Sequence, residues 1–256
     1  MSTADRVLGV LKLFTMDRPQ WTIDEAAQAM GLPVSTMYRY FRSLTGAGLL
    51  VNFAAGRYVV GPAVIEMDRQ ARAWDPLIVA GRPVMAGLAG HVPPTAIIML
   101  CRIYRLQVMC VDQVADPARA LPISYERGRL MPLYPGSASK VILAHLRPAT
   151  LRSCFAEDCA AIAQAGLGED WETFKASLRA IRKSGVAITC GDIDPGIMGI
   201  SAPVISPEGD IVGSISIVST VDEADEDRRA TYVDLIRGAG REVTERLREI
   251  AWPAVV

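Results

Sequence analysis

The sequence is poor in the residues on which most metal and redox sites depend. It contains two histidines, His91 and His145, and neither lies beside a cluster of cysteines or acids with metal-ligand spacing. Five cysteines are present without a C-x2-C pair, and the closest two, Cys154 and Cys159, fit neither a zinc finger nor a redox motif. We therefore expect reduced, small apolar cysteines, no metal ion and no cofactor.

Asparagine is almost absent. This excludes an enzyme class whose sequence motifs two short segments match. "SASK" at 137–140 and "KSG" at 183–185 match motifs of the penicillin-recognising enzymes, whose chemistry also needs an amide in an S-x-N element. The single asparagine, Asn52, lies far upstream. The chain also lacks a phosphate loop and a dinucleotide fingerprint. We do not expect an enzyme.

Long hydrophobic runs are missing as well. The longest uncharged apolar stretch, "TAIIMLC", is too short to cross a bilayer, and the first residues lack the pattern of a secretion signal. Half of the residues are hydrophobic and the net charge is −1. These features predict a cytosolic globular protein without a membrane partner.

Acidic residues are absent from one segment, 31–65, which nevertheless contains three arginines. Residues 1–61 carry six lysines and arginines against four acids, although the whole chain is slightly acidic. A local basic surplus of this kind favours an anionic partner for the N-terminal part of the chain.

The first 44 residues predict three helices that form a helix-turn-helix. Apolar residues follow helical spacing over 4–15 and 21–30, and Thr22 with Glu25 forms a capping-box pattern. Gly31 ends the second helix, and Pro33 sets the first turn of the third. The spacing predicts that one face of the third helix enters the core, namely Val34, Met37, Phe41 and Leu44. The residues expected to point away are Thr36, Arg39, Tyr40 and Ser43, with Ser35 and Arg42 beside them.

A β-hairpin is expected next, because the runs 49–53 and 57–61 surround "AAG" with Gly56 in the turn. Three helices and a hairpin make a winged helix-turn-helix, in which hydroxyls reach phosphates or bases and arginine reads guanine. We expect Tyr38 and Arg42 near the DNA backbone and Arg57 in a minor groove. The alternative is a solvated face of a protein-binding winged helix. The expected DNA contacts are Ser35, Thr36, Tyr38, Arg39, Arg42, Ser43 and Arg57.

The rest of the chain predicts a second, α+β domain with an antiparallel sheet. A helix at 63–74 that stops before Asp75-Pro76 is expected to connect the two domains. The predicted domains are therefore 1–61, a linker helix at 62–75, and 76–256. The patterns then predict helices at 83–92, 136–146, 148–155, 170–183 and 225–250, and strands at 95–102, 106–114, 120–126, 185–190, 197–206 and 210–219.

A binding pocket is expected where "PGSASK" opens a helix, since the free N–H groups of a helix start can hold a carboxylate. Strand alternation places serines on a face that should otherwise be apolar. The expected pocket residues are Ser137, Ala138, Ser139, Asp192, Gly199, Ser201, Ser214, Ser216 and Val218. Three alternatives stay open: a plain N-cap, serines bonded to backbone or water, and an exposed turn aspartate.

Several of these motifs, in the same order, resemble the isocitrate lyase regulator (IclR) family of bacterial transcription factors. "TIDEAAQAMGLPVSTMYRYFRSLTGAGLL" resembles the family's helix-turn-helix, and "GRYVVGP" resembles its wing. "ERGRLMPLYPGSASKVILAHL" and "RKSGVAITCGDIDPGIMGISAPVISPEGDIVGSISI" are similar to its two C-terminal signatures. The resemblance covers nearly the whole chain.

The resemblance implies a GAF-like effector domain, with an antiparallel sheet and flanking helices, and operator DNA bound by a homodimer or a tetramer of two dimers. It also implies a small organic or aromatic carboxylate as effector, and we expect a cytoplasmic repressor of a catabolic operon. An activator, or a sensor acting on a protein partner without DNA, is the alternative. The chain departs from the family at Cys190, Gly199, Ser137 and Ser139, all in the pocket region, so the effector does not follow from the resemblance.

Overall fold

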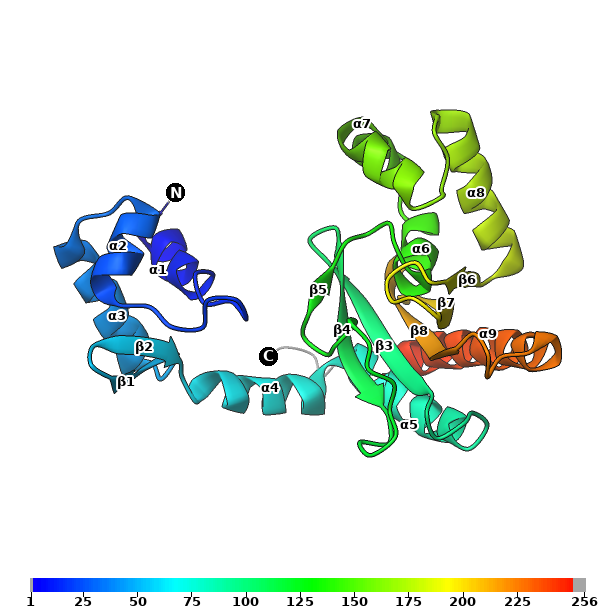
Figure 1. Ribbon diagram of the computed structural model, residues 1–256, viewed down its shortest axis with the longest axis horizontal. Coiled ribbons are helices and arrows are strands. Elements are labelled where there is room, and N and C mark those ends of the chain that lie inside the picture. Colours follow the sequence, from blue (N-terminus) through cyan, green and yellow to red (C-terminus); the bar gives the residue numbers. More distant parts are fainter. Residues whose placement is uncertain (1, 251–256) are drawn as a thin grey trace. The chain divides into compact units, whose positions relative to one another are not determined.

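The computed structural model describes residues 2–250, which form two compact units divided between Ala73 and Trp74 (Figure 1). Residues 1 and 251–256, the ends of the predicted first and last domains, lie outside the described residues. Each unit has its own core, so the two are described separately.

The first unit is a winged helix-turn-helix. Its elements are α1 Thr3–Leu11, α2 Ile23–Met30, α3 Val34–Gly46, β1 Leu50–Ala54, β2 Arg57–Val60 and α4 Ala63–Trp74. The predicted capping box at Thr22 and Glu25 is formed, and Gly31 ends α2 in the left-handed conformation that favours glycine. The core packs around Met37, Phe41 and Leu44. The three predicted helices and the hairpin are confirmed.

Two residues of α3 were assigned to the wrong face. Tyr40, expected to point away, is buried at 7% exposure, and Val34, expected in the core, is 49% exposed. Val34 opens the helix, where few neighbours can cover it, whereas Tyr40 lies one turn beyond Met37 on the buried side. The outward polar face of α3 is therefore narrower than predicted.

The hairpin is anchored to the loop before α2. Strands β1 and β2 are antiparallel with Gly56 in the turn, and Trp21 makes an isolated antiparallel bridge to Tyr58. The Tyr58 ring meets Phe41 edge-on at 4.8 Å between centroids. This third, one-residue strand was not predicted, and it fixes the position of β2 against the helices.

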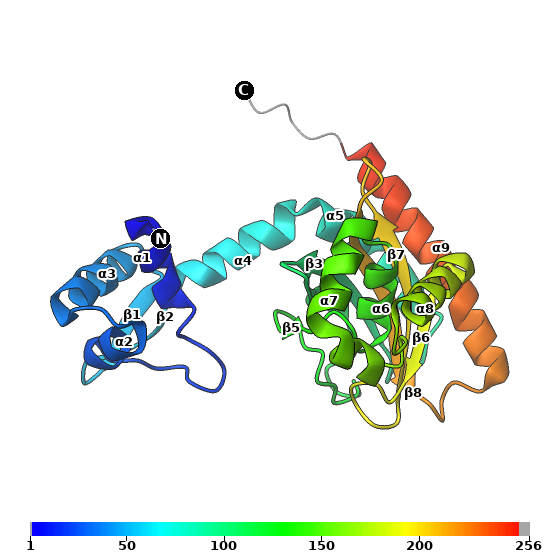
Figure 2. The same cartoon turned by 90° about the horizontal axis from the view of Figure 1, so that it is seen from above.

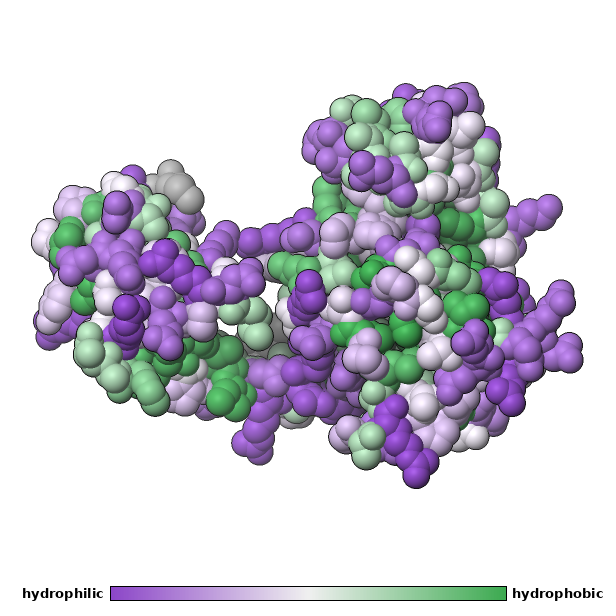
Figure 3. Space-filling view, in the orientation of Figure 1, coloured by the Kyte–Doolittle hydropathy of each residue, from purple (hydrophilic) through white to green (hydrophobic). Residues whose placement is uncertain are grey.

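Helix α4 differs from the other helices of the first unit because none of its residues is buried. It nevertheless presents apolar side chains, with Ile65 at 74% and Met67 at 53% exposure. Further apolar side chains, Val51 and Phe53, are exposed on β1. Figure 3 shows apolar side chains gathered along the lower edge of this unit, where β1 and β2 lie.

The second unit is built on a six-stranded sheet in the order β5-β4-β3-β8-β7-β6, and each neighbouring pair is antiparallel. Its strands are β3 Ile97–Tyr104, β4 Gln107–Val114, β5 Leu130–Met131, β6 Ala187–Cys190, β7 Ile197–Ile205 and β8 Ile211–Thr220. Its helices are α5 Pro76–Ala89, α6 Ser137–Ala144, α7 Pro148–Gln164, α8 Trp171–Ser184 and α9 Glu226–Glu249.

Helices cover both faces of this sheet (Figures 1 and 2). One core joins the sheet to α6, α7 and α8, and the other joins it to α5 and α9. Burial on both faces explains why β8 is buried along most of its length instead of alternating between buried and exposed residues. The predicted α+β fold with flanking helices is confirmed.

Three details of the second unit differ from the prediction. The segment 120–126 is a loop and not a strand, and Pro122, which lacks an N–H, lies in its middle. Helix α5 begins at Pro76, earlier than expected, because Asp75 caps it by accepting from the N–H groups of Leu77 and Ile78. Helix α7 continues past residue 155 through a kink at Asp158.

Within residues 2–250, no helix combines the length and the apolar character that crossing a membrane requires.

Candidate DNA-binding face and effector pocket

The polar residues predicted on α3 are presented to solvent. Ser35, Tyr38, Arg39, Arg42 and Ser43 are exposed, and Thr36 is half-buried. The first turn of α3 has no acidic residue, and its N-cap, Pro33, offers no side-chain hydrogen bond. The start of the helix therefore keeps its partial positive charge, which suits a phosphate.

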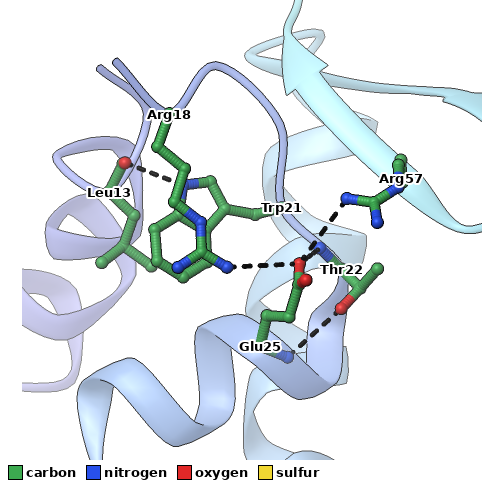
Figure 4. A network of polar contacts seen from close by, with 6 residues as sticks. All are labelled: Leu13, Arg18, Trp21, Thr22, Glu25 and Arg57. Atoms are coloured by element: carbon green, nitrogen blue, oxygen red, sulfur yellow. Dashed lines mark hydrogen bonds and ion pairs between the residues drawn. The ribbon is translucent and has the colours of Figure 1, made fainter. Parts of the chain in front are cut away.

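Arg57, predicted at the wing, forms part of a cluster around Glu25 (Figure 4). The Glu25 carboxylate lies 3.9 Å from Nη1 of Arg57 and 3.5 Å from Nη2 of Arg18. The Thr22 N–H donates to the same carboxylate at 2.9 Å, and this hydrogen bond is the main reason why the pKa of Glu25 is lowered, with smaller contributions from the two arginines. Arg18 was not among the residues predicted to contact DNA.

A pocket in the second unit lies between the start of α6 and the sheet. Its volume is about 50 Å³, whereas one water molecule needs roughly 10–15 Å³. Strands β3, β6, β7 and β8 form one wall, and the loops before α6 and after β6 form the other. The lining residues are Met99, Ile123, Tyr125, Gly136, Ser137, Ala138, Thr189, Asp192, Ile193, Asp194, Ile197, Gly199, Ser216 and Val218.

Most of the residues predicted for the pocket lie on its lining. These are Ser137, Ala138, Asp192, Gly199, Ser216 and Val218. The other three, Ser139, Ser201 and Ser214, lie behind the wall with their hydroxyls bonded inside the protein. Ser139 donates to the Pro132 carbonyl at 2.8 Å, and Ser214 reaches the Ala138 carbonyl at 3.5 Å.

Ser201 links the helix to the sheet. Its hydroxyl lies 2.7 Å from those of both Ser137 and Ser216, so three buried hydroxyls form a chain beneath the pocket. Gly199 allows this approach, because a Cβ atom at that position would lie 2.5 Å from Oγ of Ser137. The small residue at 199 therefore sets the distance between α6 and β7.

Two acids of the loop after β6 are held in place at the pocket. Oδ2 of Asp192 lies 2.6 Å from Nζ of Lys140 and accepts from the Gly136 N–H at 3.3 Å. Asp194 accepts from the N–H and hydroxyl of Ser124 at 2.9 and 2.6 Å. Lys140 thus neutralises one of the two carboxylates, and Ser124 fixes the other.

The start of α6 offers free donors to the pocket. The first backbone bond of this helix runs from Lys140 to Gly136, and within residues 2–250 the N–H groups of Ser137 and Ala138 make no hydrogen bond. Both residues line the cavity. Unpaired N–H groups at a helix start are suited to a carboxylate oxygen.

Sequence reasoning missed several lining residues, among them Tyr125 and Thr189. Tyr125 is 6% exposed, its hydroxyl has no hydrogen-bond partner among the described residues, and burial is the main reason why its pKa is raised. Its loop had been predicted as a strand, which concealed its approach to the pocket. Thr189 could have been found, because alternation on β6 turns it inward together with Ala187.

Over residues 2–250, no group of three or more His, Cys, Asp or Glu side chains is arranged to hold a metal ion. The pocket's polar groups are hydroxyls, two acids and the amides at the start of α6, a set of donors and acceptors that can orient a small molecule. A winged helix-turn-helix followed by a domain with such a pocket defines a ligand-sensing DNA-binding regulator.

Comparison with known families identifies this chain more closely. The family "IclR helix-turn-helix domain" matches residues 3–52, and "Bacterial transcriptional regulator IclR C-terminal" matches residues 76–245. The chain therefore belongs to the IclR family, whose members are transcriptional regulators and not enzymes.

Individual relatives are distant but span the full chain. The HTH-type transcriptional regulator KipR of Bacillus subtilis is 21% identical over 245 residues, covering 96% of both chains. An IclR transcriptional regulator from Alicyclobacillus acidocaldarius is 21% identical with a TM-score of 0.79, over 96% of this chain and 98% of that one. An IclR homologue from Microbacterium hydrocarbonoxydans, complexed with 4-hydroxybenzoate, is 22% identical with a TM-score of 0.80, over 97% and 100%. At these identities the structural likeness concerns the fold.

Proposed function

We propose that this regulator represses a catabolic operon, binding double-stranded operator DNA through residues 1–61 and responding to a small organic or aromatic carboxylate held by residues 76–256. The linker helix, residues 62–75, carries the response between them. An effector that binds one arrangement of the two DNA-binding heads better than another shifts the population toward it.

The observation that carries the carboxylate is the start of α6. Two free N–H groups, on Ser137 and Ala138, lie on the pocket lining with Lys140 one turn further along the helix. The helix dipole adds partial positive charge at the same place. The complex of the Microbacterium homologue with 4-hydroxybenzoate is consistent with an aromatic acid as the effector.

The effector contacts in this proposal are the predicted residues that reach the lining: Ser137, Ala138, Asp192, Gly199, Ser216 and Val218. Ser139, Ser201 and Ser214 support them from behind through the hydrogen bonds already described. Ser201 donates its one hydroxyl proton to Ser137, so Ser216 donates to Ser201. The Ser137 hydroxyl is then left to donate to the ligand and the Ser216 hydroxyl to accept from it, which sets the ligand's orientation.

Isothermal titration of the full chain with benzoate and with neutral benzamide tests this proposal. We expect benzoate to bind and benzamide to bind at least about tenfold more weakly, because only the anion gains from the start of α6. Ser216→Leu fills the pocket and should abolish benzoate binding. Equal binding of both probes, or unchanged binding by Ser216→Leu, would contradict the carboxylate site.

DNA binding is proposed to need a homodimer, or a tetramer of two dimers, joined through the first unit. Support comes from α4, which buries none of its own residues and yet exposes Ile65 and Met67. A second copy of the chain would cover these side chains. Sedimentation of an Ile65→Glu protein should show more monomer than the wild type, and an unchanged distribution would place the interface elsewhere.

A further inference from the structure

We infer that Arg18 and Arg57 form a phosphate-binding pair on the winged helix-turn-helix, gathered around the Glu25 carboxylate, whose place a phosphate takes. The inference rests on the proposed DNA binding and assigns a contact to Arg18, which the sequence did not indicate. It also moves Arg57 from the minor groove to the DNA backbone.

Figure 4 shows how the two arginines lie around Glu25. Arg18 comes from the loop before α2 and Arg57 from the first residue of β2, yet both guanidinium groups reach the Glu25 carboxylate, at 3.5 and 3.9 Å. The side chains of Arg18 and Arg57 are 50% and 49% exposed. Two cations that share one anion leave a net charge of +1 on the surface.

The cluster of Arg18, Arg57 and Glu25 contributes little to the stability of the first unit. Ion pairs between exposed side chains add little to stability, and the two distances exceed those of good charge-assisted hydrogen bonds. Each guanidinium has five N–H donors, and over residues 2–250 neither guanidinium forms a hydrogen bond with a protein acceptor. Most of these donors therefore remain available to a ligand with several acceptor oxygens.

The Arg18 side chain and the strand that carries Arg57 are positioned before any ligand arrives. The Arg18 guanidinium stacks over Trp21 at 3.4 Å from the ring centroid, and the indole N–H of Trp21 donates to the Leu13 carbonyl at 2.8 Å. Trp21 and Tyr58 exchange two backbone hydrogen bonds, of 3.1 and 2.8 Å, which hold β2 beside the Arg18 loop. The stacked, planar guanidinium of Arg18 therefore loses little further entropy when it binds an anion.

The partner that fits this pair of arginines is a phosphate of the DNA backbone. In helix-turn-helix proteins the helix before the recognition helix crosses the DNA backbone, and the cluster lies at the start of that helix, α2. Phosphate oxygens accept from arginine in a bidentate manner, and such contacts position the protein without reading the sequence. A DNA phosphate would take the place of Glu25 as the acceptor for part of the pair.

The test is fluorescence anisotropy of the full chain with a duplex of arbitrary sequence, at salt concentrations between about 50 and 200 mM. We expect Arg18→Ala and Arg57→Ala each to reduce the slope of log affinity against log salt by about 1, and to weaken binding to every duplex alike. Arg119→Ala, which removes an exposed arginine from the second unit, should leave the slope unchanged.

Two further variants separate phosphate binding from a structural role. Arg18→Lys keeps the charge and should retain the slope. Glu25→Gln keeps the capping box, because glutamine also serves in that position, but it removes the competing carboxylate and should raise affinity for any duplex several-fold. A folded Arg18→Ala protein with the wild-type slope, or a Glu25→Gln protein with weaker binding, would overturn the inference. Wild-type protein that bound no duplex would instead refute the proposed function.

Discussion

Nζ of Lys140 lies 2.6 Å from Oδ2 of Asp192, so a lysine behind the pocket is paired with a carboxylate on the pocket lining. Both side chains are largely buried, at 13% and 22% exposure, where charges interact more strongly than at the surface. The same Asp192 oxygen accepts from the Gly136 N–H just before α6. An anionic effector must therefore bind beside this carboxylate or displace it from Lys140.

Removing the negative charge of Asp192 should strengthen the binding of an anionic effector. Asp192→Asn keeps an oxygen that accepts from the Gly136 N–H but removes a negative charge, so we expect benzoate affinity to rise about tenfold. Lys140→Met leaves the acid without its partner and should weaken benzoate binding by a similar factor. Isothermal titration measures both effects, with benzamide as the probe that neither variant should affect. If benzoate binds all three proteins equally, the ion pair has no part in effector binding.

Adding one methyl group at residue 199 should separate α6 from the sheet. In Gly199→Ala the new Cβ would lie 2.5 Å from Oγ of Ser137, so the helix must move or Ser137 must abandon its bond with Ser201. We expect a loss of about 1–3 kcal/mol in the free energy of unfolding, measured by urea denaturation. Gly87→Ala in α5 is the control, because its Cβ would meet no atom within 4 Å. Equal stability of the two variants would show that α6 tolerates the displacement.

Substitutions at two adjacent residues of α3, Arg39 and Tyr40, should affect DNA binding and stability separately. Arg39→Ala should weaken operator binding by about 1–3 kcal/mol without changing the melting temperature, because its side chain is exposed. Tyr40→Ala should reduce stability by about 3 kcal/mol, because Tyr40 is buried in the core of the first unit. Thermal melts and anisotropy on the same samples distinguish the two effects. An Arg39→Ala protein with wild-type affinity for its operator would remove Arg39 from the interface.

Lowering the pH should destabilise the second unit, because the folded state disfavours protonation of His145. Burial is the main reason why the pKa of His145 is lowered from 6.5, and the nearby charge of Arg182 lowers it further, although the hydrogen bond between Nδ1 and the Val141 carbonyl opposes both. The unfolded chain then binds this proton more readily, so the stability that the neutral ring contributes is present above pH 6.5 and is lost as the pH falls below it.

The free energy of unfolding, measured in urea from pH 7 down to pH 5, tests this titration. His145→Gln should flatten the decline, whereas the same substitution at the exposed His91 should follow the wild type. Identical declines for wild type and His145→Gln would assign the acid sensitivity to other groups.

Local signals predicted the first unit well. The capping box at Thr22 and Glu25, the glycine at 31 and the turn at Gly56 each fix a backbone conformation within a few residues, and all three are confirmed. Tyr40 was misassigned because an amphipathic tyrosine fits either face of a helix, and only the packing around Phe41 settles its direction.

The pocket depends on contacts between distant segments, which periodicity cannot show. Alternation placed Ser216 and Gly199 on the correct face, but it could not show that Ser201, 64 residues from Ser137, bonds to it and not to a ligand. The Lys140–Asp192 pair joins α6 to the loop after β6 and has no sequence pattern. Tyr125 was missed because its apolar neighbours resemble a strand, although Pro122 disfavours one.

The most direct test of the account is selection of genomic DNA fragments by the purified full-length protein over a salt series, with and without benzoate. We expect enrichment of a palindromic site whose affinity falls steeply with salt and changes when benzoate is present. Genes beside that site would then indicate the natural effector. No enrichment under any condition, or enrichment indifferent to salt, would contradict operator binding by this chain and would favour a protein partner.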